Sequence, residues 1–267
     1  MPAASTWGRT TSDGPSTHGG RPDMLFLINL DDAQARRESM SAQLQALGLA
    51  HERIGVDFRR SSHAQIDAWI ATRFPGLTFD HGDVSTAEIG CWASHLCAWQ
   101  ALAESDRPAC TVLEDDLTLD AALPEAIGML SREPGLDLVF LGTSSRNVAA
   151  RRSVAAGRFR LHRALGTIYN TWGYVVSRTW VQAFLARRWR IDRPIDHYTG
   201  GRRAGEAKPR IAVLRPAVVR EHESLGPLSQ IEPFTYRIDR ARVVELARRR
   251  IIASRLSAFY YKLYDYL

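Results

Sequence analysis

The sequence has no apolar run that approaches the ~20 residues of a membrane-spanning helix, which excludes an integral membrane protein built on such helices. Residues 1–20 lack the apolar core of a secretory signal peptide, so we expect no Sec-dependent export. Cysteine is scarce, because Cys91, Cys97 and Cys110 are the three in the chain, and they form no CxxC pair or zinc-ligand spacing. These features predict a reduced, cytoplasmic protein without a structural zinc site.

Lysine is almost absent, because Lys208 and Lys262 are the two lysines among 35 basic residues. The net charge of +6 nevertheless suits polyanionic partners such as nucleic acid, anionic lipid or phosphorylated small molecules. Nucleic acid is not expected, because the sequence has no helix-turn-helix signature, RNP motif or zinc-finger spacing.

Composition divides the chain into three parts. Residues 1–22 are rich in Gly, Ser, Thr and Pro and are predicted to be disordered. Residues 24–235 carry the periodic patterns of a folded domain. Residues 236–267 are basic, rich in tyrosine and helical in pattern, which predicts peripheral contact with the inner face of the cell membrane. Packing on the domain and dimerisation are the alternatives for this tail, and the oligomeric state is not predicted.

Buried strands and helices alternate in the folded part. We expect helices at 33–47 and 86–104, and strands at 24–30, 52–56, 109–113, 136–141 and 174–177. Asp31 or Asp32 is expected to cap the first helix and Gly48 to end it, while Ser85 and Glu88 form a capping box at the second. The alternation predicts an α/β fold with a mostly parallel sheet flanked by helices.

Three acids, Glu114, Asp115 and Asp116, follow directly on the apolar strand at 109–113. In open α/β sheets, ligands bind beyond the carboxyl ends of the strands. Because side chains alternate along an extended segment, Glu114 and Asp116 are expected to share one side and to offer oxygen ligands to Mg²⁺ or Mn²⁺. A solvated acidic turn before the next helix is an equally good interpretation.

Two further segments carry candidate residues. The helix at 86–104 is apolar nearly all round and places Cys91 and His95 on one face, where we expect His95 to be a core residue satisfied by a backbone or hydroxyl partner. Asn29 ends the first strand, and Arg36 and Arg37 follow on the first helix. These residues suit a nucleotide, although the two arginines alone are more typical of a solvated helix face.

Several motifs in a fixed order give the chain a resemblance to a known family. They are Ile28-Asn29-Leu30-Asp31-x4-Arg36-Arg37, Val56-Asp57, Glu88-Ile89-Gly90-Cys91-x2-Ser94-His95, Leu113-Glu114-Asp115-Asp116, Leu141-Gly142, Thr171-Trp172-Gly173-Tyr174-Val175-Val176-Ser177, Pro194-Ile195-Asp196 and the segment 216–231. Over residues 24–232 the chain resembles glycosyltransferase family 25, the lipopolysaccharide-biosynthesis galactosyltransferases, which also includes collagen galactosyltransferases. Asn170 stands where the family usually has Gly, and Gln230 where it has Asp.

The resemblance implies a GT-A fold, a nucleotide-diphosphate-sugar donor such as UDP-galactose, and a divalent metal, Mn²⁺ or Mg²⁺. Glu114 and Asp116 stand at the family's metal and diphosphate site, and Asp115 lies between them. His222 is a further candidate metal ligand, because GT-A enzymes often supply a histidine from their C-terminal part. We expect its surroundings, residues 220–223, to be an exposed loop.

Asn29 and Asp57 correspond to positions near the nucleotide, and Asp196 to a position beside the acceptor. The acceptor hydroxyl must lose a proton, so we expect Asp196 to be the catalytic base. The alternative for Asp196 is a helix cap at about His197.

These features together predict an inverting, metal-dependent glycosyltransferase that adds a hexose, galactose by the resemblance, to a surface glycan such as lipopolysaccharide or to a lipid-linked acceptor. The alternative is a non-catalytic GT-A-fold protein that binds a glycan or another partner.

Overall fold

The structure is a computed structural model that describes residues 24–131, 135–144, 148–200 and 209–222. The predicted disordered segment 1–22, Gln230 of the closing motif and the tail at 236–267 lie outside the described residues. No helix in the described part of the chain is both long and apolar enough to cross a membrane.

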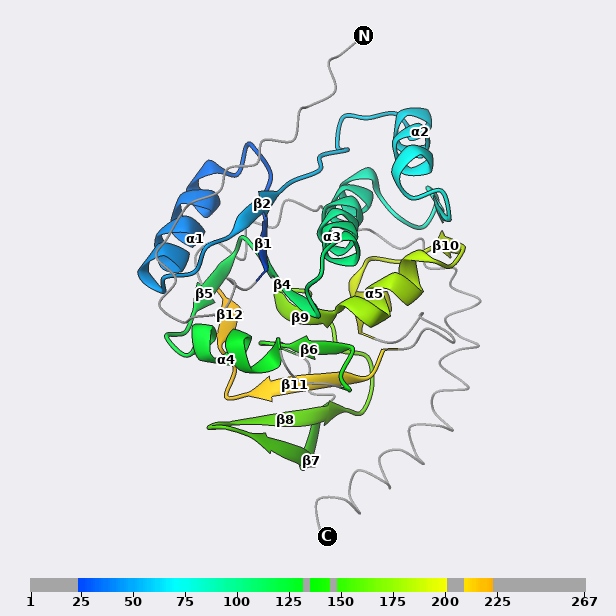
Figure 1. Ribbon diagram of the computed structural model, residues 1–267. Helices are drawn as coiled ribbons and strands as arrows, with labels where there is room; N and C mark the ends of the chain where they lie inside the picture. The colour runs from blue at the N-terminus through cyan, green and yellow to red at the C-terminus, as the bar shows by residue number, and fades with distance from the viewer. Residues whose placement is uncertain (1–23, 132–134, 145–147, 201–208, 223–267) are drawn as a thin grey trace, which may run out of the picture. The chain divides into compact units, whose positions relative to one another are not determined.

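Among the described residues, eight strands form one sheet in the order β2-β1-β4-β9-β6-β11-β8-β7 (Figure 1). These strands are β1 Leu25–Ile28, β2 Glu52–Ile54, β4 Ala109–Glu114, β6 Leu138–Phe140, β7 Val148–Ala156, β8 Phe159–Ala164, β9 Gly173–Ser177 and β11 Ile211–Arg215. Six strands point the same way, and β9 and β8 are reversed. The predicted α/β class is therefore confirmed. The sheet is mixed, because β9 and β8 each run antiparallel to both of their neighbours.

The described part of the chain holds six helices and two small accessory sheets. The helices are α1 Gln34–Ala46, α2 His63–Arg73, α3 Thr86–Glu104, α4 Leu123–Leu130, α5 Arg178–Leu185 and α6 Asp196–Thr199. The accessory sheets pair β3 Leu77–Phe79 with β10 Trp189–Ile191, and β5 Leu117–Leu119 with β12 Val219–Glu221.

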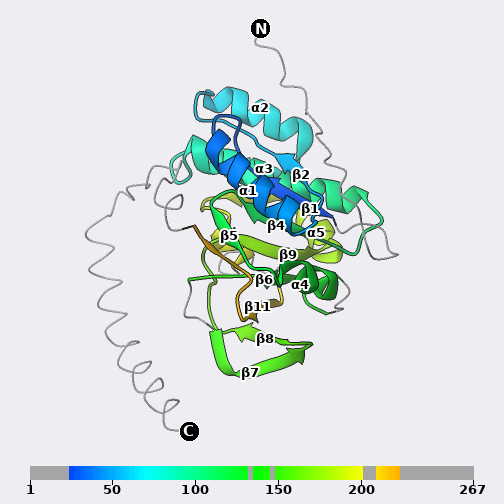
Figure 2. The same ribbon diagram turned by 90° about the vertical axis from the view of Figure 1, so that its left-hand side faces the viewer.

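Helices cover both faces of the large sheet around β1. In β1, Leu25 and Leu27 pack with α1 and α4 on one face, while Phe26 and Ile28 pack with α2, α3 and α5 on the other. Figure 2 shows α1 in front of β1 and β4. A strand that is buried on both faces has no polar side, which explains why β1 reads as a continuous apolar run.

Local sequence signals account for the N-terminal end of α3 and for the C-terminal end of α1. Helix α3 begins and ends as predicted, and Ser85 and Glu88 form the expected capping box. Gly48 follows α1 with φ of +67°, and its N–H donates to the Gln45 carbonyl oxygen at 3.0 Å. Glycine adopts this left-handed conformation without steric cost, so Gly48 ends the helix as predicted.

The predicted cap of α1 is wrong. The cap position is Ala33, which makes no side-chain cap hydrogen bond. Asp31 instead pairs with Arg53 at 2.7 Å, and Asp32 pairs with Arg59 at 2.7 Å. Both acids therefore pair with arginines, Arg53 within β2 and Arg59 after it, and neither caps the helix that directly follows them.

Candidate active site

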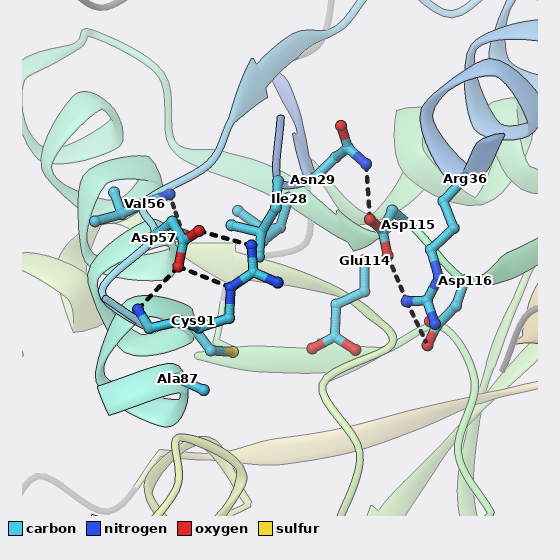
Figure 3. A pocket seen from close by; sticks show the side chains of 13 residues that line it. Ile28, Asn29, Arg36, Val56, Asp57, Ala87, Cys91, Glu114, Asp115 and Asp116 are labelled. Atoms are coloured by element: carbon cyan, nitrogen blue, oxygen red, sulfur yellow. Dashed lines mark hydrogen bonds and ion pairs between the residues drawn. The ribbon is translucent and has the colours of Figure 1, made fainter. Parts of the chain in front are cut away.

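The acid cluster, which consists of Glu114, Asp115 and Asp116, lies where β4 ends, beside the end of β1. Ile28 of β1 is in register with Glu114 of β4, so Asn29 and Asp115 follow side by side. A pocket of about 150 Å³ opens here (Figure 3). Its lining comes from the ends of β1 and β4, from α1 and α3, and from the segment after β2, and consists of Ile28, Asn29, Leu30, Arg36, Val56, Asp57, Arg59, Ala87, Cys91, Ser94, Glu114, Asp115 and Asp116.

Asp115 and Asp116 share the guanidinium of Arg36. Arg36 Nη1 lies 3.0 Å from Asp115 Oδ1 and 3.6 Å from Asp116 Oδ2, and Asn29 Nδ2 donates to Asp115 Oδ2 at 2.7 Å. Arg36 is buried, so its interpretation as a solvated helix face is wrong. The expected alternation does not extend past Glu114, because the strand ends there and the chain bends at residues 115–116.

The environment of Asp116 suits a bound cation. Burial and the nearby negative charge of Glu114 raise the pKa of Asp116 to about 7, although Arg36 opposes the shift. Asp116 Oδ1 is buried and has no hydrogen-bond partner among the described residues. A buried carboxylate with an unpartnered oxygen, beside a second carboxylate, supplies the hard oxygen ligands that Mg²⁺ and Mn²⁺ prefer. The residues present therefore fit a divalent metal.

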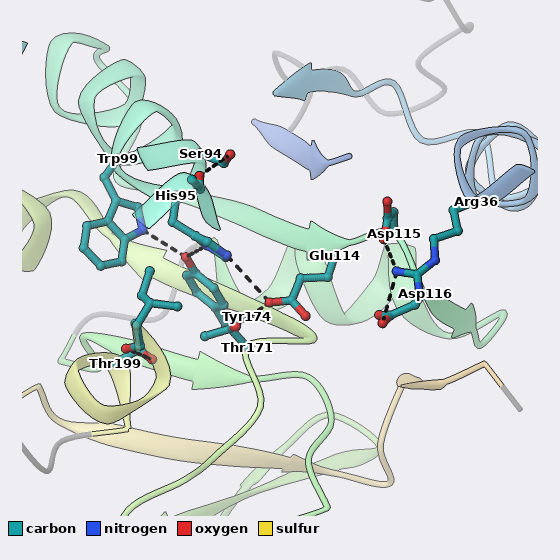
Figure 4. Close-up of polar contacts among 12 residues, drawn as sticks. Arg36, Ser94, His95, Trp99, Glu114, Asp115, Asp116, Thr171, Tyr174 and Thr199 are labelled. Carbon is teal, nitrogen blue, oxygen red and sulfur yellow. Dashed lines mark hydrogen bonds and ion pairs between the residues drawn. The ribbon is translucent and has the colours of Figure 1, made fainter. Parts of the chain in front are cut away.

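Glu114 turns towards α3 and β9, away from Arg36 (Figure 4). Thr171 Oγ1 donates a hydrogen bond to Glu114 Oε1, and His95 Nε2 lies 3.7 Å from the same oxygen. On its other side, His95 Nδ1 is 2.8 Å from the Tyr174 hydroxyl, which also accepts from Trp99 Nε1 at 3.0 Å. The predicted hydroxyl partner of His95 is confirmed at Nδ1, whereas the contact of Thr171 with Glu114 was missed.

Gly90 and Ser94 hold the Val56-Asp57 segment against α3. A Cβ atom on Gly90 would lie 2.8 Å from the Val56 carbonyl oxygen, so only glycine permits this approach. Ser94 Oγ accepts from the Val56 N–H at 2.9 Å and donates to the Gly90 carbonyl at 2.9 Å. This packing brings Asp57 to the rim of the pocket.

Asp57 reaches the pocket as an ionised carboxylate. Arg59 Nη2 lies 2.6 Å from Asp57 Oδ2, and the Arg59 backbone N–H donates to Oδ1 at 2.9 Å. These hydrogen bonds lower the pKa of Asp57. The carboxylate is therefore held in one orientation beside the pocket, and its contact with a nucleotide stays a prediction.

His222 lies beside the acid cluster at the level of the backbone. Residues 220 and 221 belong to strand β12, so the loop expected at 220–223 is wrong at these two positions. Strand β12 runs antiparallel to β5, and the His222 N–H donates to the Asp116 carbonyl oxygen at 2.7 Å. Gly142 permits the approach of β12 to the sheet, because a Cβ there would lie 2.0 Å from the Val219 carbonyl oxygen. Metal ligation by the His222 ring stays a prediction.

Asp196 lies at the start of α6, within the electrostatic influence of Glu114. Its carboxylate accepts backbone hydrogen bonds from Asn170 and His197, while its buried Oδ1 has no hydrogen-bond partner among the described residues. Burial, with the charge of Glu114 as a further cause, raises the pKa of Asp196 to about 6. The cap position of α6 is Ile195, so Asp196 is the first helical residue rather than the cap.

The backbone conformation of Asn170 explains why asparagine can replace the glycine that is usual in the family at this position. Its φ of +71° lies in the left-handed region, where glycine is most easily accommodated and asparagine is the most frequent alternative. The backbone N–H that Asn170 presents in this conformation donates to Asp196. Asparagine thus keeps the turn that positions the Asp196 carboxylate.

Comparison with known proteins identifies the family of the chain. The profile of glycosyltransferase family 25 (LPS biosynthesis protein) matches residues 23–199. The chain belongs to glycosyltransferase family 25. The family 25 match includes Asn29, Asp57, the acid cluster and Asp196, and it ends before His222.

Curated relatives of this family 25 chain include animal proteins. Procollagen galactosyltransferase 1 of Danio rerio is 28% identical over 174 residues, which cover 61% of this chain and 28% of the relative. A glycosyltransferase 25 family member of Drosophila melanogaster is 25% identical over 185 residues, covering 66% of this chain and 30% of the relative. The chain therefore matches less than a third of the length of these relatives.

Proposed function

We propose that this chain is a hexosyltransferase that moves galactose from UDP-galactose to a hydroxyl of a surface glycan such as lipopolysaccharide. Membership of family 25 and the likeness to a procollagen galactosyltransferase support the reaction class and the sugar. The observation that carries the proposal is the pocket at the ends of β1 and β4, into which the acid cluster and Asn29 project. A sheet edge of this kind, flanked by helices, is consistent with a GT-A fold.

Glu114 and Asp116 are the proposed ligands of the metal, Mn²⁺ or Mg²⁺, with the ring of His222 as a third candidate. When bound, the metal supplies positive charge that neutralises the leaving nucleoside diphosphate. Arg36 pairs with Asp115 and lies 3.6 Å from Asp116 Oδ2, so Asp116 Oδ1 is the oxygen of this carboxylate that we propose for the metal. Asn29 Oδ1 is buried and has no hydrogen-bond partner among the described residues, so it is available to a donor group of the nucleotide.

Asp196 is the proposed catalytic base. The bond between the sugar C1 and the diphosphate oxygen breaks, a C1–oxygen bond to the acceptor forms on the opposite face, and the acceptor proton passes to Asp196. The pKa of about 6 supports this role, because the carboxylate is then ionised at neutral pH and still basic enough to take a proton. Attack from the opposite face inverts the configuration at C1.

The direct test is release of UDP from a panel of UDP-sugars, with a bacterial glycan extract as acceptor, in Mn²⁺ and in EDTA. We expect turnover with UDP-galactose in Mn²⁺ and loss of turnover in EDTA. Equal rates in EDTA would exclude the metal, and turnover with another UDP-sugar alone would exclude galactose. Absence of turnover with every UDP-sugar of the panel would contradict the proposed transfer activity.

We also propose a cytoplasmic location with peripheral membrane contact through residues 236–267, which lie outside the described residues. The support is the basic, tyrosine-rich composition of this segment. In a liposome flotation assay, the full chain should float with anionic vesicles and a chain ending at residue 235 should not. Equal flotation of the two proteins would refute membrane contact through the tail.

A further inference from the structure

Cys91, His95 and Glu114 bring three different metal-binding groups together. Cys91 and His95 are four residues apart on one face of α3, and Glu114 faces them from the end of β4 (Figures 3 and 4). The Cys91 sulfur, a His95 ring nitrogen and a Glu114 carboxylate oxygen all lie within 4.8 Å of one another. Ligands of a tetrahedral zinc ion, bound at ~2.0 to ~2.3 Å, are separated by roughly 3.3 to 3.8 Å, so a small adjustment suffices.

The state of His95 points independently to a missing partner. The side chain is fully buried, and its Nε2 has no hydrogen-bond partner among the described residues. The 3.7 Å from Nε2 to Glu114 Oε1 is too long for a hydrogen bond but matches the separation of two ligands on one metal ion. Buried polar atoms are normally satisfied, so an ion between these two atoms accounts for the arrangement.

The surroundings already hold the ring as a metal ligand requires. His95 Nδ1 contacts the Tyr174 hydroxyl at 2.8 Å, and Trp99 Nε1 fixes that hydroxyl at 3.0 Å. Histidines that bind metals through one nitrogen are usually oriented by a hydrogen bond at the other. On the opposite side, Thr171 Oγ1 orients the Glu114 carboxylate.

We propose that Cys91, His95 and Glu114 form a binding site for a thiophilic divalent cation, Zn²⁺ in the first place. Thiolate, imidazole and carboxylate together select zinc over the hard cations that all-oxygen sites prefer. On binding, the Cys91 thiol gives its proton to solvent and its sulfur bonds the metal. Cys91 and Glu114 line the pocket, which provides an entry path for the ion.

This site goes beyond the proposed transfer reaction, although the two share Glu114. Zinc held by Cys91 and His95 would engage the carboxylate that the donor's cation also needs. Metal binding can nevertheless be measured without donor or acceptor, so the zinc site and the transferase proposal can fail separately.

The test uses Co²⁺ as a spectroscopic substitute for Zn²⁺ on the metal-stripped full chain. A Co²⁺–thiolate bond produces a charge-transfer band in the near ultraviolet, which oxygen and nitrogen ligands alone do not. We expect this band in the wild type, its displacement by Zn²⁺, and its loss in Cys91→Ser. The same substitution should weaken Zn²⁺ binding at least ~10-fold in a chelator competition assay.

Cys97→Ala is the matched control, because Cys97 lies on the same helix but is buried in the core. This variant should keep both the band and the zinc affinity. A wild type without a near-ultraviolet band at saturating Co²⁺ would overturn the site. A band of equal strength in Cys91→Ser would overturn it as well, because the thiolate would then come from another cysteine.

Discussion

Removal of the positive charge of Arg36 should destabilise the chain far more than the loss of a surface arginine. Arg36→Met keeps the length of the aliphatic stem and removes the guanidinium that serves Asp115 and Asp116. The Arg36 and Asp115 side chains are 10% and 12% exposed, so their pair is buried. Loss of one partner of a buried pair costs about 3 to 5 kcal/mol, because the remaining charge is left uncompensated. At about 2 to 4 °C per kcal/mol, the melting temperature should fall by roughly 6 to 20 °C.

The penalty should depend on pH in a defined direction. In the folded chain the pKa of Asp116 is about 7 and the pKa of Asp115 is raised, from an ordinary value of 3.8. A carboxyl with a raised folded pKa contributes stability that is present below pH ~4 and is lost as the pH rises through its folded pKa. Loss of Arg36 raises both pKa values further. The deficit of Arg36→Met should therefore be larger at pH 8 than at pH 5, as measured by urea unfolding in EDTA.

Arg37→Met is the control. Arg37 is half-buried on the same helix, and its side chain makes a 3.4 Å contact with the Asp31 carbonyl oxygen. Its replacement should change the free energy of unfolding by no more than about 0.5 kcal/mol. The reasoning would be refuted if the two variants unfolded alike at pH 8, or if the deficit of Arg36→Met grew towards pH 5.

Three further predictions concern the site. Asp116→Ala should abolish transfer. Its stability at pH 8 in EDTA should not fall, because the substitution removes a buried ionised carboxylate, and a large fall in melting temperature would contradict this. Asp196→Asn should fold and bind donor but transfer at least ~100-fold more slowly, and wild-type kcat/KM should fall below pH about 6 as Asp196 is protonated; near-normal transfer by the variant would exclude Asp196 as the base. Gly90→Ala should cost about 1 to 3 kcal/mol in chemical unfolding, because its Cβ would meet the Val56 carbonyl at 2.8 Å, whereas Gly128→Ala, with open space at its Cβ, should be neutral or stabilising.

The parts of the fold that were predictable depend on neighbours in the sequence. The capping box of Ser85 and Glu88 spans three residues, and the left-handed Gly48 is a local feature of the helix end. Helix α2 carries the same kind of signal, because Ser62 and Gln65 form a capping box, so the start of this helix was predictable as well. The reversal of β9 and β8 was not predictable, because strand direction depends on pairing between distant segments.

The same distinction holds for the candidate site. The acid cluster and Asn29 were recognised because they follow apolar strands, whose carboxyl ends meet at one edge of the sheet. The partners of these residues were missed, because Arg36 is 79 residues from Asp115 and Thr171 is 57 residues from Glu114. Which carboxylate an arginine or threonine contacts is decided by packing, which a single sequence does not encode locally.

Binding of a sugar nucleotide together with a divalent cation at the acid cluster tests the central claim most directly. Thermal unfolding of the wild type and of Asp116→Ala is measured with UDP-galactose and other sugar nucleotides, in Mn²⁺ and in EDTA. A ligand at 100 times its Kd stabilises by about 2.7 kcal/mol, or roughly 5 to 11 °C. The account predicts a shift of this size for UDP-galactose in the wild type with Mn²⁺, and its loss in EDTA and in Asp116→Ala. No shift with any sugar nucleotide, or an equal shift in Asp116→Ala, would contradict it.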